Sequence, residues 1–327
     1  MRVLITGATG FIGSHLAEQV HQKGYTLRCL VRKTSNLRWI EHLPVEYCYG
    51  DLFDENVLRQ AIAEVDYVYH VAGLTKAKTR EEYFLGNHIG TKNLLDAVAK
   101  VNPKLKRFIL VSSLAAVGPS LNGTPVNEET PYHPITAYGE SKMEAEKECL
   151  KMVGRLPVTI VRPPAVYGPR DRDVFEFFKS VNKGLQPMIG LKTKTVSLIY
   201  VTDLVNGIIL AGEHRAGVGK AYFISSERYY SWKEVGDITT RIMQKKALRV
   251  KIPVWVVYTI AAVSELFSMA TGKAVLLNME KARDIVQDAW TCDISKAESE
   301  LGFHESYSLE DGIQKTVRWY REQGWLK

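Results

Sequence analysis

A tyrosine and a lysine four residues apart are the clearest candidates for proton-transfer chemistry in this chain of 327 residues. Tyr138 and Lys142 stand at a spacing that puts both side chains on one face of a helix. A free tyrosine has a pKa of about 10, so it acts as an acid or base near neutral pH only where a cation stabilises its phenolate. Lys142 can supply that cation and can also hydrogen-bond a ribose.

A pair of serines provides a second group of reactive hydroxyls. Ser112 and Ser113 follow the apolar run 107–111, a candidate strand. Ligands bind at the carboxyl ends of strands in parallel sheets, where a hydroxyl can polarise a substrate carbonyl or orient an alcohol beside the phenol. The alternative role for two serines at this position is to cap the end of the strand.

Three glycines near the N-terminus indicate a phosphate-binding turn. Gly7, Gly10 and Gly13 stand between a short β-branched run, 3–6, and an amphipathic segment, 11–23. At this spacing the first glycine allows a tight turn, the second lets a pyrophosphate approach the backbone, and the third lets the helix pack on the strand. The N–H groups and positive dipole of the helix N-terminus then bind the phosphates. The sequence therefore predicts a dinucleotide site.

The residues after the second candidate strand bear on which dinucleotide is bound. An NAD site usually has an acidic residue about 20 positions beyond the glycines, which binds the ribose hydroxyls. Here the run 26–31 ends in Arg32 and Lys33, followed by Thr34 and Ser35. A guanidinium pairs well with a 2′-phosphate, so NADP is favoured over NAD. The alternative is a solvated basic loop, which leaves NAD open.

The order of the elements predicts an α/β fold of the Rossmann, doubly wound type, because short β-branched runs alternate with longer amphipathic segments. The expected strands are 3–6, 26–31, 45–49, 67–71, 107–112 and 158–162. The expected helices are 11–23, 56–63, 82–101 and 136–153.

The domain division follows from where this alternation ends. Residues 1–165 are expected to form the dinucleotide-binding domain, and 166–327 mainly a smaller α+β substrate-binding region. Segments near 198–215 and 282–300 are expected to return to the first domain.

The most apolar stretch of the chain is 252–270. A membrane span needs about 20 predominantly apolar residues, and this stretch is interrupted by Pro253 and by Ser264 and Glu265, so spanning is excluded. A buried helix of the second region is the favoured interpretation. The alternatives are a wall for a lipophilic substrate or a surface helix in peripheral contact with a membrane.

Composition excludes several other classes of protein. Lys and Arg outnumber the acids by 43 to 36, an excess that favours anionic ligands but is too diffuse to indicate nucleic acid. Cys29, Cys48, Cys149 and Cys292 are too widely spaced for a zinc site or a disulfide framework, so no metal is expected. The chain runs directly from Met1 into the glycine motif, so we expect a cytoplasmic protein.

Together these motifs resemble the extended short-chain dehydrogenase/reductases, which include NAD-dependent epimerases and dehydratases, 3β-hydroxysteroid dehydrogenases and dihydroflavonol-type reductases. The resemblance covers essentially the whole chain. Its further markers are Gly50-Asp51-Leu52, His70-Val71-Ala72-Gly73, Asn87, the run 162–169 that begins Arg162-Pro163-Pro164, Tyr200-Val201-Thr202-Asp203-Leu204 and the run 308–312.

The resemblance implies a role for each site residue. Tyr138 would be the general acid/base, Lys142 would lower its pKa, Ser113 would assist the substrate oxygen, and Asn87 would complete the catalytic group. The full expected cofactor set is Gly7, Thr9, Gly10, Phe11, Ile12, Gly13, Arg32, Asp51, Leu52, Val71, Ala72, Gly73, Ser112, Tyr138, Lys142, Pro163 and Val166. The expected substrate contacts are Thr75, Arg170 and Tyr200. A homodimer that pairs the segments 82–101 and 136–153 is also implied.

Departures from the family pattern narrow the reaction. Leu114, Ala115 and Ala116 stand where the 4,6-dehydratases carry an acidic pair, and Val117 stands where sugar epimerases usually have Tyr. The leading hypothesis is reversible hydride transfer between NADP(H) and a secondary alcohol or ketone of a fairly apolar substrate.

Two alternatives stay open. One is a nucleotide-sugar 4-epimerase with tightly bound NAD, in which Arg170, Arg172, Lys192 and Lys194 would bind a diphosphate. The other is a non-catalytic, cofactor-sensing binding protein.

Overall fold

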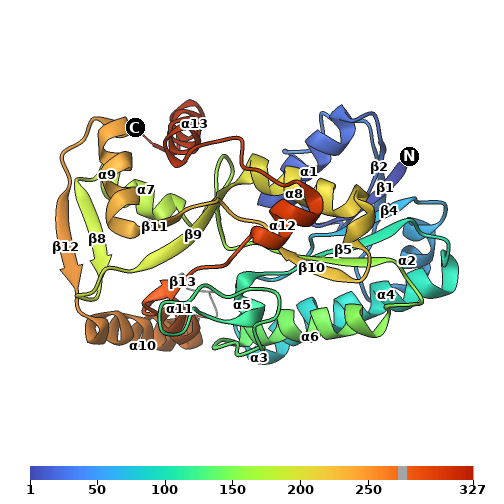
Figure 1. Ribbon diagram of the computed structural model, residues 1–327, viewed down its shortest axis with the longest axis horizontal. Coiled ribbons are helices and arrows are strands. Elements are labelled where there is room, and N and C mark those ends of the chain that lie inside the picture. The colour runs from blue at the N-terminus through green and yellow to red at the C-terminus, as the bar shows by residue number, and fades with distance from the viewer. Residues whose placement is uncertain (272–277, 327) are drawn as a thin grey trace.

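The computed structural model describes residues 1–271 and 278–326 and is built around one seven-stranded parallel sheet (Figure 1). The strand order is β10-β6-β5-β4-β1-β2-β3. This is the order of a doubly wound sheet, in which strands are added outward first on one side of β1 and then, from β4 on, on the other side. The Rossmann expectation is confirmed. The strands are β1 (Arg2–Thr6), β2 (Thr26–Val31), β3 (Val45–Tyr49), β4 (Tyr67–His70), β5 (Arg107–Val111), β6 (Val158–Arg162) and β10 (Lys220–Phe223).

Helices cover both faces of the sheet, because successive side chains of each strand point to opposite faces. In β1, Val3 and Ile5 belong to one buried cluster, whereas Leu4 belongs to the other. The first cluster lies under α1 (Phe11–Gln22) and α8 (Val201–Glu213). The second lies under α2 (Glu55–Ile62), α4 (Gly90–Val101) and α6 (Ala137–Lys151).

The expected helix over 82–101 is interrupted. The structure has a short α3 (Arg80–Tyr83), then a π-helical turn η1 (Phe84–Ile89), and only then α4. Turns of this type are rare and are frequent at functional sites. Asn87 lies within the π turn and is buried.

The seventh strand comes from the later half of the chain and was not expected. β10 pairs with β6 in parallel, with Lys220 opposite Thr159 and Phe223 opposite Arg162. It is reached through α8 and the short η2 (Arg215–Gly217), and α12 (Ser295–Leu301) packs beside it. The sheet is therefore completed by residues well beyond the expected domain boundary.

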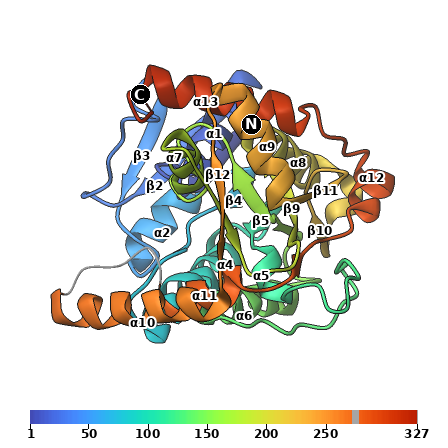
Figure 2. The ribbon, with the colours of Figure 1, turned by 90° about the vertical axis from the view of Figure 1, so that its left-hand side faces the viewer.

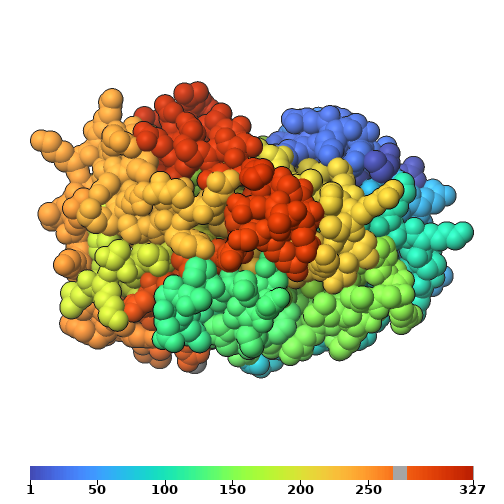
Figure 3. All heavy atoms as spheres, viewed as in Figure 1, coloured from blue at the N-terminus to red at the C-terminus, as the bar shows by residue number. Residues whose placement is uncertain are grey.

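Most of the remaining elements form the other end of the molecule, as the space-filling view shows (Figure 3), whereas α5 packs on α6. β7, β11 and β13 all pair with β9, and β8 pairs with β12 in parallel. The strands are β7 (Ala165–Tyr167), β8 (Leu185–Ile189), β9 (Thr195–Tyr200), β11 (Tyr229–Ser231), β12 (Leu248–Ile252) and β13 (Ala289–Trp290). The helices are α5 (Leu114–Val117), α7 (Phe175–Asn182), α9 (Trp232–Met243), α10 (Val254–Thr271), α11 (Met279–Ile285) and α13 (Leu309–Glu322).

The favoured interpretation of 252–270 as a buried helix is wrong for one side of α10. Val257 and Ala261 are buried against Ala282 of α11. Trp255 and Leu266, however, are 70% and 67% exposed. In Figure 2, α10 runs along the lower margin of the molecule and extends beyond its neighbours. Among the described residues, no helix is long and apolar enough to cross a membrane.

Candidate active site

The glycine turn after β1 has the geometry of a phosphate cradle. Gly7 has a φ of +76°, and a Cβ there would lie 2.6 Å from the backbone N of Ala72. A Cβ on Gly13 would lie 2.1 Å from the carbonyl O of Gly7, so α1 can approach the turn only with glycine there. No side chain caps α1 at Gly10, which leaves its first-turn N–H groups for a ligand. The turn therefore fits a pyrophosphate.

The residues expected to bind the rest of the dinucleotide follow the carboxyl ends of neighbouring strands. Arg32 and Lys33 are exposed directly after β2. Asp51 is exposed after β3, where its carboxylate accepts a hydrogen bond from the backbone N of Phe53 at 2.8 Å. β1, β2 and β3 are adjacent, so these side chains lie along the same edge as the glycine turn. At this edge the cations could bind a phosphate, and the carboxylate could accept hydrogen bonds from hydroxyl or amino groups.

An unsatisfied hydroxyl marks the end of β5. Ser112 is 4% exposed, and within the described residues its Oγ is buried without a hydrogen-bond partner. Buried polar atoms are normally paired, so an orphaned one indicates a missing ligand or water. The next carbonyl along this edge, that of Pro163, is already bonded to the N–H of Leu114 at 2.8 Å. Ser112 thus fits its expected place beside a cofactor.

Lys142 brings a buried ammonium to the same place. The side chain of Lys142 is almost fully buried, and its Nζ donates to the carbonyl O of Val111 at 2.7 Å. A Cβ on Gly73 would lie 3.7 Å from this Nζ, so the ammonium lies between the end of β5 and the loop after β4. Burial lowers the pKa of Lys142 to about 8, against the opposing effect of the Glu146 carboxylate.

Tyr138 lies one turn before Lys142 and contacts the predicted serine. α6 begins where Thr136 Oγ1 accepts from the N–H of Gly139 at 3.1 Å, which sets the first turn that carries Tyr138. Burial raises the pKa of Tyr138 to about 12, and a hydrogen bond with the Ser113 side chain acts in the opposite direction. Tyr138 and Ser113 are therefore hydrogen-bonded, and Lys142 lies one turn further along the same helix. The pKa of Tyr138 is raised, not lowered as the expected effect of Lys142 would have it.

Behind Lys142 is a buried ion pair that the sequence analysis missed. Glu146 is 0% exposed, and its carboxylate accepts from Arg162 Nη2 at 2.7 Å and from the Tyr132 hydroxyl at 2.7 Å. Glu146 follows Lys142 by one helical turn, and its charge raises the pKa of that lysine. The pairing joins α6 to β6, and no local pattern predicts a partner across two elements. The only available signal was the i,i+4 spacing from Lys142.

Asn87 uses its side-chain amide in hydrogen bonds within the chain. Its Oδ1 accepts from the N–H of Leu74 at 2.6 Å, and its Nδ2 donates to the carbonyl O of Leu74 at 3.0 Å and to Ser141 Oγ at 2.9 Å. These bonds occupy the amide and tie the loop after β4 to α6. Asn87 therefore links this loop to the helix that carries Tyr138, and its catalytic role stays a prediction.

The three expected substrate residues differ in their surroundings. Thr75 is exposed in the loop after β4. Arg170 donates to the carboxylate of Glu18 on α1 at 2.6 Å, so its guanidinium is engaged within the chain. Tyr200 is 6% exposed, with its ring centroid 5.0 Å from that of Tyr307. Arg170 and Tyr200 thus link elements of the chain, and their contact with a substrate stays a prediction.

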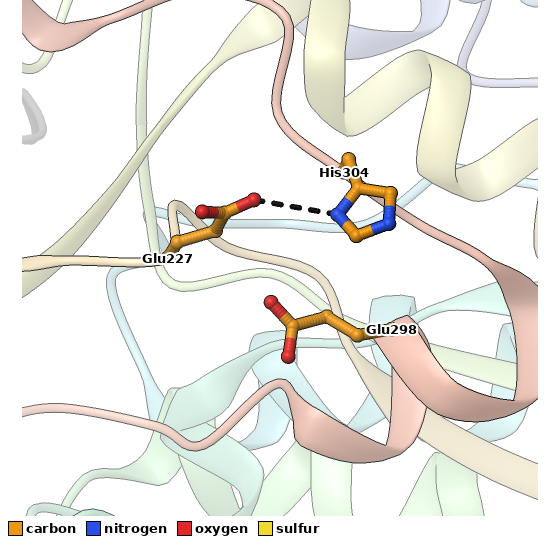
Figure 4. A group of neighbouring side chains, drawn as sticks. All are labelled: Glu227, Glu298 and His304. Atoms are coloured by element: carbon orange, nitrogen blue, oxygen red, sulfur yellow. Dashed lines mark hydrogen bonds and ion pairs between the residues drawn. The ribbon is translucent and has the colours of Figure 1, made fainter.

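A group of possible metal ligands lies elsewhere. One ligand atom from each of Glu227, Glu298 and His304 falls within 4.8 Å of the others (Figure 4). Glu227 and His304 form an exposed ion pair at 3.4 Å. Exposed carboxylates with a histidine are common without an ion, so we assign no metal to this group.

A known family matches the part of the chain that carries the glycine turn, Ser112, Ser113, Tyr138 and Lys142. The profile described as the NAD dependent epimerase/dehydratase family matches residues 3–225. The chain belongs to this family. Its members are NAD-dependent enzymes related to the extended short-chain dehydrogenase/reductases, as the motifs indicated.

Relatives that match over nearly the whole chain include two named for lipid substrates. A ceramide reductase of Caulobacter vibrioides is 31% identical over 326 residues, which covers 99% of this chain and 96% of that protein. A decarboxylating sterol-4-alpha-carboxylate 3-dehydrogenase of Mus musculus is 26% identical, with 96% and 89% covered. Among solved structures, the UDP-glucose 4-epimerase of Thermotoga maritima with UDP-glucose superposes with a TM-score of 0.81 at 22% identity, covering 99% of each chain. That last likeness concerns the fold alone.

Proposed function

We propose that this family member catalyses reversible hydride transfer between NADP(H) and a secondary alcohol or ketone of a fairly apolar substrate. The observation that carries the proposal is the Ser113–Tyr138–Lys142 set at the carboxyl end of β5, beside a glycine turn that fits a pyrophosphate.

The chain's own groups supply the proton. In the reduction direction the Tyr138 hydroxyl gives its proton to the substrate oxygen, and Ser113 donates a hydrogen bond to the same oxygen. The ammonium of Lys142, one turn along α6, stabilises the phenolate that remains. When bound, the nicotinamide supplies or accepts the hydride. The alcohol direction reverses each of these steps.

The preference for NADP rests on the end of β2. Arg32 and Lys33 are exposed there, where an NAD site would usually carry an acid. Neither residue forms an ion pair with a described acid, so both cations are available to a 2′-phosphate. A guanidinium binds such a phosphate through two parallel hydrogen bonds.

The apolar character of the substrate has two supports. The relatives named above act, by their names, on a ceramide and on a sterol carboxylate. In addition, cations that could bind a sugar diphosphate already have partners, since Lys192 pairs with Asp288 at 3.1 Å and Arg170 with Glu18. The absence of acids from α5 argues against dehydration.

We also propose that the protein forms a homodimer through α4 and α6, by likeness to its family. These two helices pack side by side on one face of the sheet. Light scattering on the purified chain measures the mass directly, and a monomer at micromolar concentration would contradict the proposal.

The test of the function is an oxidation assay. Purified protein is mixed with NADPH or NADH and with long-chain ketones, sterol ketones or UDP-glucose, and reduced nicotinamide is followed by absorbance. We expect net oxidation of NADPH with an apolar ketone and none in Tyr138→Phe. Conversion of UDP-sugars without net cofactor turnover would indicate an epimerase instead. Cofactor binding without any turnover would indicate a sensing protein.

A further inference from the structure

The outer side of α10 is apolar although it faces solvent. Trp255, Val263 and Leu266 are 70%, 61% and 67% exposed, and their spacing of eight and three residues puts them on one side of the helix. A helix that is hydrophobic all round is normally buried. Contiguous exposed apolar surface of this kind marks an interaction site.

The strand that leads into this helix is cationic and equally exposed. From 244 to 264 the chain contains Lys245, Lys246, Arg249 and Lys251 and no acid. Arg249 pairs with Asp237 at 2.6 Å, whereas none of the three lysines forms an ion pair within the described part of the chain.

Apolar side chains alternate with these cations on β12. Leu248 is 69% exposed and Val250 is 37% exposed. Because successive side chains of a strand point to opposite faces, Leu248 and Val250 lie on one face of β12 and Lys251 lies on the other, and exposed side chains occur on both faces.

We propose that β12 and the outer side of α10 form a docking surface for a membrane that carries anionic lipids. The apolar side chains would enter the boundary between headgroups and acyl chains, with Trp255 at the headgroup level. Lys245, Lys246 and Lys251 would lie near the negative surface, where each basic residue contributes to attraction. The helix lies on the membrane and does not span it.

Charge distinguishes this occupant from a second copy of the chain. A two-fold interface uses the same surface on both subunits. It would therefore bring together two copies of the acid-free, cationic segment 244–264. Anionic headgroups supply the opposite charge that a second copy lacks.

The docking surface is close to the catalytic helix. α11 packs on the inner side of α10 through Ala282, and the Glu280 carboxylate accepts from the backbone N of Ala137 at the start of α6. Asp284 of α11 is near enough to raise the pKa of Tyr138. A docked molecule would hold its active site one helix away from the lipid. This consequence rests on the proposed function, whereas docking itself does not.

Vesicle flotation of the full chain tests the proposal. The vesicles are phosphatidylcholine alone or mixed with phosphatidylglycerol, at low and high salt. We expect the protein to float with the anionic vesicles at low salt. Lys245→Gln/Lys246→Gln/Lys251→Gln should lower partitioning by about a hundredfold, at roughly fivefold per lysine. Trp255→Ser/Leu266→Gln should lower it at least about tenfold.

Matched controls change exposed residues elsewhere. Val218→Gln replaces an apolar residue that is 49% exposed, and Lys104→Gln removes an exposed cation. Both should float like the unchanged protein. The proposal fails if the unchanged protein does not float, if the controls lose partitioning equally, or if Trp255→Ser instead dissociates a dimer measured by light scattering. Flotation does not depend on enzymatic turnover. The docking proposal can therefore be tested even if the proposed reaction is wrong.

Discussion

The central sheet and the α10 layer differ in what they do with apolar side chains. Every residue of β5 is buried, whereas four of the five residues of β12 are exposed. The sheet has two large buried clusters, but the buried cluster under α10 centres on Val257, Ala261 and Ala282. The candidate site residues therefore lie on the part of the molecule with the larger buried core. The layer beside it has only a small buried cluster and leaves several apolar side chains exposed.

The largest expected effect comes from the catalytic tyrosine. Tyr138→Phe removes the proton donor while it keeps the ring, so turnover should fall by about a thousandfold. NADPH binding should persist, because the glycine turn and Lys142 are unchanged. Steady-state kinetics and fluorescence titration of NADPH measure the two effects. Turnover within tenfold of the unchanged protein would remove Tyr138 from the role of acid/base.

The second largest effect is expected from the buried ion pair between Glu146 and Arg162. Glu146→Gln leaves Arg162 buried without its carboxylate, and such a loss costs about 3 kcal/mol in the free energy of unfolding. The charge of Glu146 raises the pKa of Lys142, so the variant should have a lower lysine pKa. The phenolate needs the charged ammonium, so activity should fall as the pH rises through the pKa of Lys142. In the variant this fall should occur at a lower pH than in the unchanged protein.

A matched control lies one half-turn away. Glu144 pairs with Lys147 at 2.8 Å near the surface, so Glu144→Gln should cost less than about 0.5 kcal/mol. Urea unfolding and pH–rate profiles measure both variants. An unchanged pH profile in Glu146→Gln would show that the ion pair only links α6 to β6 and does not affect Lys142.

The end of β2 should give a smaller, selective effect. Arg32→Ala removes one charge-assisted contact to a 2′-phosphate, so NADPH affinity should fall by about tenfold and NADH affinity by less than about twofold. Isothermal titration with each cofactor measures the split. Lys104→Ala, an exposed cation elsewhere, should change neither affinity. Equal losses for the two cofactors would show that Arg32 does not distinguish them.

The smallest effect is expected on the outer side of α10. Val263→Asn changes a side chain that is 61% exposed, so stability should move by less than about 0.5 kcal/mol. Leu110→Ala in β5, at 0% exposure, should cost about 3 kcal/mol. Urea unfolding compares them. A large loss from Val263→Asn would mean that this side of α10 is packed, and the contrast between the two regions would not hold.

The sequence allowed good prediction where the controlling interactions are local. All six expected strands are present to within one residue at either end, because buried parallel strands are continuous β-branched runs. Tyr138 and Lys142 lie one turn apart on α6, as their spacing in the sequence predicts. β10 was missed because only two of its four residues, Tyr222 and Phe223, are buried, so the segment has little hydrophobic pattern.

Other features depend on contacts between distant segments. The partners of Arg170 and Tyr200 come from α1 and from the segment before α13, so their engagement could not be read from neighbouring residues. The exposure of α10 was missed for a different reason. A helix that is apolar on every side has no periodic signal that distinguishes its buried side from its exposed one.

The position of β10 has a consequence for how the chain is made. A ribosome releases β6 about sixty residues before β10, the strand that covers its edge. During that interval β6, whose five residues are all buried in the finished molecule, is an open edge on which another nascent chain could pair. β6 thus gains its second neighbour in the sheet only after residue 223 has been synthesised.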